Sequence, residues 1–380
     1  MALKSMENQH FNLPWMLVIV FIIFGVHLLI YYTFFHKIPG RYAFYGVGVL
    51  FLCNCAYILH HHLSLPPKLE FLFSICTGIS FFLFVGAVLF YILISPFFLF
   101  ASKEQCFLAL PYIKTFCVIL SVLGIVFSLY NGLGKKPMVK TLEIPIAKLK
   151  EPFSIAQISD LHLNALTKSK DLKDLIWKIN ALHPDAIMLT GDIIDAPLSK
   201  IREKLPLLGD LKARYGIYYV LGNHEYYHDT HAILEAIKNL GIMVLNNSST
   251  IIIKDQKPLL NIIGITDLSG NKMGFFSPDI NQAILKRNPN IPSILLSHQP
   301  AVISHLEDKK VDLILSGHTH GGQIFPFNFL VLLKQPYLKG LHHYDSHSLI
   351  YINQGTGFWG PPMRLFTRSE ITFITLKPQE

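Results

Sequence analysis

The chain is poor in charged residues and in cysteine. Only 15% of its 380 residues are Asp, Glu, Lys or Arg, against roughly 25% in an average soluble domain. All five cysteines lie within the first 117 residues, which excludes a disulfide-rich fold for the rest of the chain. Residues 1–150 hold 11 Lys and Arg but only four Glu and no Asp. Because this basic excess flanks apolar segments and does not cover a folded domain, no nucleic-acid partner is expected.

Four long apolar runs explain the shortage of charge. They cover residues 13–35, 42–59, 71–94 (continuing to 100) and 111–130. Each is close to or above the roughly 20 residues with which a helix crosses a bilayer. Aromatic residues gather at their ends, as in the interfacial belts of membrane proteins. We therefore predict a membrane domain, residues 1–136, with four transmembrane helices, in which the cysteines serve as small apolar residues.

The basic residues between these runs predict an orientation. Four crossings place both ends of the membrane domain on one side. That side carries Lys4, Lys68, Lys135, Lys136 and Lys140, and the opposite side carries Lys37, Arg41 and Lys103. Because loops rich in Lys and Arg stay in the cytoplasm, we expect the remainder of the chain to be cytoplasmic.

A turn-rich basic linker at residues 131–136 leads into a different pattern, in which short apolar runs alternate with helical or polar stretches. The expected strands are 138–148, 153–159, 186–190, 217–221, 242–245, 251–253, 260–265, 293–297, 312–316, 350–353 and 371–376. The expected helices are 172–182, 201–214, 231–240 and 280–286. This mixture is typical of one α/β domain, residues 137–380.

Five polar motifs follow predicted strands. They are Asp160-Leu161-His162, Gly191-Asp192, Gly222-Asn223-His224-Glu225, Ser297-His298 and Gly317-His318-Thr319-His320. Residues two apart in an extended chain point the same way, so Asp160 and His162 can face one point. Ligands of open α/β sheets collect at the carboxyl ends of strands, and the glycines allow close backbone approach there. We expect the motifs to converge on one site.

The side chains of these motifs are suited to metal ions. His, Asp and Asn supply nitrogen and oxygen donors without a thiolate, a set that suits Mn, Fe, Zn, Co or Ni. Several His with two Asp are too many for one tetrahedral zinc and fit two ions about 3.5–4 Å apart. The expected cofactors are therefore two divalent metal ions, Mn, Zn or Fe.

Taken in order, the motifs resemble those of the calcineurin-like metallophosphoesterases over roughly residues 142–376. The stretch Gly-His-Thr-His-Gly-Gly-Gln at 317–323 and the tail at 355–364 are similar to the bacterial membrane-associated phosphodiesterase branch. The resemblance implies a β-sandwich flanked by helices, behind the four transmembrane helices. It also implies one metal on Asp160, His162 and His320, a second on Asn223, His298 and His318, and Asp192 bridging both.

The same resemblance assigns the acid chemistry. His224 would act as a general acid or stabilise charge on the phosphoryl oxygens. Asp195 would orient His224; alternatively it is a surface-loop acid or a helix cap. Arg364 would hold the substrate phosphate or pair with Glu370. Residues 342–347, which include three histidines, are expected to form a polar loop outside the site.

The expected function is metal-dependent hydrolysis of phosphate esters by a dinuclear site. A phosphodiesterase in the inner or plasma membrane of a bacterium, acting on a lipid-linked phosphodiester or pyrophosphate, is the leading hypothesis. A phosphomonoesterase or nucleotidase is the alternative within the same chemistry. An alternative of another class is a membrane ligand-binding protein with an inactive phosphoesterase-like domain, although all seven ligand positions are filled. The expected partners are a phosphate-ester substrate and membrane lipids, and no oligomeric state is predicted.

Overall fold

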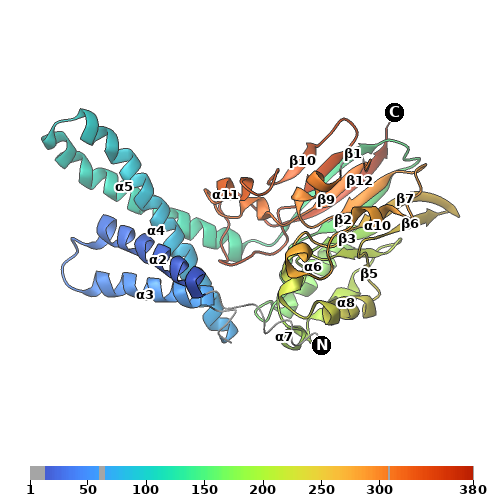
Figure 1. Cartoon of the computed structure of the whole chain (residues 1–380), viewed down its shortest axis with the longest axis horizontal. Helices are drawn as coiled ribbons and strands as arrows, with labels where there is room; N and C mark the ends of the chain where they lie inside the picture. Colours follow the sequence, from blue (N-terminus) through green and yellow to red (C-terminus); the bar gives the residue numbers. More distant parts are fainter. Residues whose placement is uncertain (1–12, 60–64, 307–308, 380) are drawn as a thin grey trace. The chain divides into compact units, whose positions relative to one another are not determined.

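The computed structural model describes residues 13–59, 65–306 and 309–379, and the chain divides into two compact units (Figure 1). Unit 1 comprises Met1–Leu129 with Gly360–Pro362, and unit 2 comprises Tyr130–Trp359 with Met363–Glu380. The expected domain boundary between residues 136 and 137 remains a prediction. Lys4, used above to predict the orientation, lies outside the described residues.

The described part of unit 1 is helical. Its helices are α2 (Leu13–Ile30, extended by the π-helical turn Tyr31–Phe35), α3 (Tyr42–Ile58), α4 (Pro67–Phe100) and α5 (Lys103–Leu129, followed by the π-helical turn Tyr130–Gly134). Three stretches are long and apolar enough to cross a membrane: Pro14–Phe35, Pro67–Phe100 and Lys103–Gly134. The 17 residues of α3 span about 25 Å, less than the roughly 30 Å of a hydrocarbon core. Among the described residues, three of the four expected spans are therefore long enough, and a fourth crossing remains a prediction.

The start of α5 was predicted incorrectly. The expected helix began at Pro111, but α5 begins at Lys103 and contains Pro111 in its interior. The reason is a capping box: the Gln105 backbone N–H donates to the Ser102 hydroxyl, and the Ser102 N–H donates to the Gln105 side chain. These bonds satisfy donors that a helix start would otherwise leave unpaired, so the helix begins eight residues before the proline.

Small residues bring α4 and α5 together. The Ser121 hydroxyl of α5 donates to the carbonyl of Phe82 in α4 at 3.2 Å. A Cβ atom on Gly86 would collide with the same hydroxyl, so the two helices touch where α4 has no side chain. Close approach through glycine and serine is typical of helix pairs in membranes, where lipid is as apolar as the helix surface.

Within its described residues, unit 2 contains two six-stranded sheets. In order across the first sheet, the strands are β1 (Met138–Ile146), β12 (Glu370–Pro378), β2 (Phe153–Ile158), β3 (Ala186–Thr190), β4 (Ile217–Val220) and β5 (Met243–Val244). The second sheet contains β10 (Gly340–His343), β11 (Leu349–Ile352), β9 (Leu313–Ser316), β8 (Ser293–Leu296), β7 (Lys257–Gly264) and β6 (Ser248–Lys254). Strands β2 to β5 are parallel, as are β7 to β9.

Alternating side chains explain how the layers pack. On β3, Ala186 and Met188 belong to a buried cluster that includes residues of both sheets. Ile187 and Leu189 lie on the other face, in a cluster with α6 (Ser169–Asn180) and α8 (Thr230–Asn239). This period of two is that of a strand buried on both faces. The expected mixed α/β fold with two sheets is therefore confirmed.

Two sequence predictions in unit 2 were wrong. The expected helix 201–214 is instead α7 (Leu198–Ile201) and a 3-10 turn, Leu205–Asp210. Pro206 has no N–H to donate within a continuous helix. Part of the expected polar loop at 342–347 is the strand β10, which pairs antiparallel with β11 at the edge of the sheet. Edge strands often carry polar side chains, so β10 lacks the apolar pattern by which a strand is predicted from sequence.

The remaining helical segments of unit 2 are short. They are α9 (Gly270–Met273), α10 (Ile280–Ile284), α11 (Asn328–Leu332) and the 3-10 turns His224–Tyr227, Pro300–His305 and His320–Gly322. Two of the 3-10 turns begin at residues of the predicted site, which places these side chains directly on the loops that follow strands.

Candidate active site

The five motifs meet where parallel strands of both sheets end. Asp160 follows β2, Asp192 follows β3 and Asn223 follows β4, and these three strands are neighbours in the first sheet. His298 follows β8 and His318 follows β9, which are neighbours in the second sheet. Because the strands are parallel within each set, their carboxyl ends lie at the same edge. The predicted convergence of the motifs is found.

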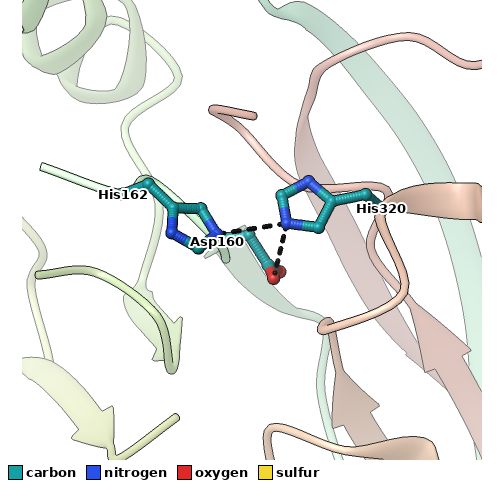
Figure 2. A group of neighbouring side chains, drawn as sticks. All are labelled: Asp160, His162 and His320. Carbon is teal, nitrogen blue, oxygen red and sulfur yellow. Dashed lines mark hydrogen bonds and ion pairs between the residues drawn. The ribbon is translucent and has the colours of Figure 1, made fainter. Parts of the chain in front are cut away.

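One group of candidate ligands is formed by Asp160, His162 and His320. Figure 2 shows the two imidazole rings facing each other across the carboxylate of Asp160. The Nε2 atoms of His162 and His320 are 3.1 Å apart, and Nε2 of His320 is 3.3 Å from Oδ1 of Asp160. All three residues are buried, so these donor atoms face a protein interior and not bulk water.

A second group is formed by Asp192, His298 and His318. Oδ2 of Asp192 is 3.0 Å from Nε2 of His298, which is 3.3 Å from Nδ1 of His318. The same Asp192 oxygen is 3.9 Å from Nε2 of His162, a member of the first group. The Asp192 carboxylate therefore reaches both groups.

Asn223 offers a further oxygen donor on the loop after β4. Its Oδ1 atom is buried and has no hydrogen-bond partner among the described residues. A buried oxygen without a donor is destabilising, which makes this atom available to a cation. The next residue fixes the turn, because the backbone N–H of His224 donates to Oδ1 of Asp192 at 2.8 Å.

The outer nitrogens of two histidines support a metal-binding role. Nδ1 of His162 lies 3.0 Å from a carboxylate oxygen of Asp195, and Nδ1 of His298 lies 2.8 Å from the carbonyl oxygen of Thr190. Metal-binding histidines usually donate their second ring N–H to a carboxylate or carbonyl, which fixes the tautomer and the ring orientation. The residues present therefore fit divalent cations held by nitrogen and oxygen.

His224 and Asp195 form a pair beside these groups. Nδ1 of His224 is 2.8 Å from Oδ1 of Asp195, while the other Asp195 oxygen contacts His162. Burial alone would lower the pKa of His224, but the carboxylates of Asp192 and Asp195 outweigh it and raise this pKa to about 9. The imidazole is thus stabilised in its protonated form, as a proton donor requires.

Five of the candidate ligands have a left-handed backbone. Asp160, His162, Asp192, His318 and His320 have φ angles between 49° and 70°. Asp160 and His162 were expected to converge because the chain is extended there, and that reason was wrong. Their side chains converge through left-handed turns, a conformation that is unfavourable for residues other than glycine and that concentrates at functional sites.

The glycines before these residues are required by space. A Cβ atom on Gly222 would collide with the carboxylate and the backbone nitrogen of Asp192, and one on Gly317 would collide with Ser159 and Asp160. Gly191 also has a positive φ of 82°. Close backbone approach, expected from the sequence, is therefore present at all three motif glycines.

Glu225 is a residue of the site whose role the sequence did not reveal. Its carboxylate is fully buried and accepts four backbone N–H groups. Oε2 accepts from Asp192 at 3.1 Å and from Gly222 at 2.8 Å, and Oε1 accepts from Ile193 at 2.7 Å and from Ile194 at 2.9 Å. One side chain thus joins the loop after β3 to the loop after β4. Its place in the Gly-Asn-His-Glu motif was the available signal.

Arg364 does not form the ion pair with Glu370 that was one of its two expected roles, and a contact with the substrate phosphate remains a prediction. It is fully buried, and among the described residues the Glu370 carboxylate accepts from Tyr351 and Gln354 instead. Its Nη2 atom donates to the carbonyls of Gln354 at 2.9 Å and Gly357 at 2.6 Å, and lies 3.3 Å from Nδ1 of His320. Burial lowers the pKa of Arg364 to about 10, which leaves it charged at neutral pH. Arg364 therefore supports the loop behind a candidate ligand.

Comparison with known proteins gives a consistent result. The family model for calcineurin-like phosphoesterases matches residues 153–322. A protein of Helicobacter pylori named as a metallophosphoesterase is 34% identical over 90% of this chain and 91% of its own length. A Campylobacter jejuni metallophosphoesterase is 38% identical over 68% of each chain. A Danio rerio transmembrane protein with a metallophosphoesterase domain is 34% identical over 68% of this chain and 61% of its own length.

Among solved structures, a dimetal phosphatase from Danio rerio is similar with a TM-score of 0.39 and 16% identity, over 60% of this chain and 99% of that one. The family assignment does not depend on this distant likeness. The family is shown by the family model together with the Helicobacter pylori relative, whose match covers 90% of this chain and 91% of its own length. The chain therefore belongs to the calcineurin-like metallophosphoesterases and is a phosphoester hydrolase.

Proposed function

We propose that this chain is a membrane-anchored phosphodiesterase whose site holds two divalent cations. Asp160, His162 and His320 would hold one cation, Asn223, His298 and His318 the other, and Asp192 both. The observation that carries the proposal is the position of Asp192, whose carboxylate reaches both donor groups. When bound, such cations supply Lewis acidity at the phosphoryl oxygens and lower the pKa of a water.

The chain's own residues supply a proton. In the proposed reaction the oxygen of a water that has released a proton to solvent forms a bond to phosphorus while the bond from phosphorus to the leaving oxygen breaks. Asp195 accepts from Nδ1 of His224 and so keeps the other ring nitrogen directed toward the site, 3.9 Å from Asp192. That Nε2–H would donate its proton to the leaving oxygen. No covalent intermediate with the protein is needed.

The proton donor suits monoesters and diesters alike, so the preference for a diester rests on the membrane helices. The alkoxide that leaves from either ester is a strong base, and protonation by a positioned histidine accelerates its departure by about 10²–10⁴-fold. The three long apolar helices support a substrate near the membrane, such as a lipid-linked phosphodiester or pyrophosphate.

The lysines that follow the last helix support a cytoplasmic catalytic domain. We further propose that α3 is a fourth crossing and that the two sheets are the layers of the family's β-sandwich.

The first test uses the full chain purified in detergent, stripped with a chelator and reloaded with Mn²⁺, Zn²⁺ or Fe²⁺. We expect faster cleavage of bis(p-nitrophenyl) phosphate than of p-nitrophenyl phosphate, with two ions bound per chain. Asp192→Asn should lose both ions and activity, whereas Asp174→Asn, at an exposed surface pair with Lys136, should lose neither. His224→Ala should keep both ions and lose about 10²–10⁴-fold in rate.

Three results would count against the proposal. Faster cleavage of the monoester would favour a phosphomonoesterase or nucleotidase. Binding of a single ion would remove the dinuclear site. Failure of every metal to restore cleavage of either ester would favour a membrane protein whose phosphoesterase-like domain only binds a ligand.

A further inference from the structure

The segment around α11 exposes an unusual number of apolar side chains. None of the five residues of α11, all of them described, is buried. We call the exposed set the apolar patch, and its members are Phe325, Phe327, Phe329, Leu330, Leu332, Leu333 and Phe366. Leu333 and Phe366 are 75% and 70% exposed. A single exposed leucine is ordinary, but a contiguous exposed apolar patch usually marks a binding surface.

The apolar patch is a built surface that joins two distant segments. The Phe325 ring packs edge to face against Phe329 at 5.8 Å and against Phe366 at 5.6 Å, measured between ring centroids. Below these rings, the backbone N–H of Leu365 donates to the carbonyl of Gln323 at 2.9 Å. The aromatic side chains are therefore held in place while they face outward.

The chain segment that contains α11 carries charges of one sign. No acidic residue occurs between Asp312 and Asp345, a stretch that carries Lys334 and Lys339. Nζ of Lys339 donates to the carbonyl of Phe366 at 3.3 Å, which places its ammonium group at the edge of the apolar patch. Aromatic and leucine side chains rimmed by lysine are the combination with which peripheral segments bind anionic lipid surfaces.

The apolar patch adjoins the candidate active site. The turn His320–Gly322 carries a candidate ligand, and α11 follows it after a few residues. A Cβ atom on Gly322 would collide with Asn328, the first residue of α11. The start of α11 therefore packs directly on the turn that positions His320, so a surface that contacts α11 lies beside the site.

We propose that the apolar patch inserts into the surface of a lipid bilayer and sets the active site at the lipid–water interface. A bilayer is the occupant we favour because unit 2 is covalently linked to helices long and apolar enough to cross one, which keeps the local concentration of lipid high. The basic rim adds attraction to anionic headgroups. Insertion of the apolar patch does not depend on the proposed function, whereas its consequence for a lipid-linked substrate rests on that function.

A fluorescence experiment on the full chain tests insertion. The five native cysteines are free and lie outside unit 2, so they are first replaced by alanine. A single Leu333→Cys substitution is labelled with the environment-sensitive dye NBD. The matched control is Leu285→Cys, because Leu285 is 79% exposed and lies outside the apolar patch. Both proteins are reconstituted into vesicles of phosphatidylcholine with phosphatidylglycerol.

We expect doxyl-labelled lipid to quench the dye at position 333 at least twofold more than the dye at position 285, and aqueous iodide to show the opposite order. Equal quenching at the two positions would overturn insertion. A dye at 333 that is shielded from iodide but untouched by doxyl lipid would also overturn it, because another protein or a second copy of the chain would then cover the apolar patch.

An activity measurement tests the consequence. The double variant Leu330→Ser, Leu333→Ser should cleave bis(p-nitrophenyl) phosphate at the wild-type rate but a bilayer-embedded phosphatidyl-p-nitrophenol at least threefold more slowly. An equal loss on both esters, or no loss on either, would contradict a role at the interface. Cleavage of neither ester by the wild type would reject the proposed function, while the quenching experiment would still decide whether the apolar patch inserts.

Discussion

The buried carboxylate of Glu225 provides the sharpest test of how the site is assembled. Four backbone N–H groups point at its two oxygens, so a proton on this carboxyl would face a donor. Burial and the nearby Asp192 carboxylate raise the pKa of Glu225, and the N–H groups oppose that rise. With donors on every side, we conclude that Glu225 acts as an anion and that its charge joins the two loops.

Replacing Glu225 by glutamine keeps the shape and changes two contacts. The amide oxygen can still accept from Ile193 and Ile194, but the NH2 group then faces the N–H groups of Asp192 and Gly222. Each lost hydrogen bond to a charged group corresponds to about 1.5–3 kcal/mol, hence about 3–6 kcal/mol for the two. For a domain of this size, that lowers the midpoint of thermal unfolding by roughly 6–24 °C.

The assay is thermal unfolding of the full chain in detergent, followed by tryptophan fluorescence, together with the metal content of the purified protein. Because the displaced loops carry Asp192 and Asn223, bound metal should fall with stability. The control is Glu235→Gln on α8, where the side chain is 68% exposed and pairs with Lys238; its midpoint should stay within about 2 °C. A Glu225→Gln protein with the midpoint and metal content of wild type would refute the reasoning.

Three further substitutions test other parts of the site. Asp195→Asn removes one of the carboxylates that raise the pKa of His224 to about 9. Because activity that needs protonated His224 is lost as pH rises through this pKa, the alkaline limb of the pH–rate profile should move to lower pH. An alkaline limb at the wild-type pH would contradict the pairing of Asp195 with His224. Gly222→Ala places a Cβ against Asp192 and should reduce the amount of bound metal, measured by mass spectrometry. The control is Gly241→Ala, at a position with open space but a positive φ, which should lower stability without reducing bound metal. Arg364→Met leaves the carbonyls of Gln354 and Gly357 without their donor and should lower stability by about 2–6 kcal/mol; recovery in Arg364→Lys would show that the planar, multidentate guanidinium is unnecessary.

The fold was predictable from the sequence where apolar periodicity was strong. Strand β3 was expected at 186–190 and is found at Ala186–Thr190, because a run buried on both faces stands out from its polar neighbours. Strand β10 was missed because an edge strand with two histidines has no such contrast. The start of α5 was missed because only the apolar run was considered, although Ser102 and Gln105 have the Ser-x-x-Gln spacing of a capping box, which their paired hydrogen bonds confirm.

The membership of the site was more predictable than its construction. The residue types and their order after strands indicated which side chains meet, since parallel strands end at one edge. The left-handed turns at Asp160 and His162 were not predictable, because neither residue type requires a positive φ. Nor was the role of Arg364, since its partners are backbone carbonyls whose positions depend on the folded loop.

The features of the site that could not be predicted from the sequence share one physical cause. A left-handed backbone at a residue such as His320 costs roughly 1–2 kcal/mol, and the candidate ligands also bring two carboxylates into the interior. Such a site persists only if surrounding groups determine its geometry. Here that support comes from residues without an assigned chemical role: Glu225 gathers four N–H groups behind Asp192, and Arg364 gathers carbonyls behind His320. One is an anion that binds donors and the other a cation that binds acceptors, so together they hold loops from both sheets in a conformation that the ligand side chains alone would not maintain.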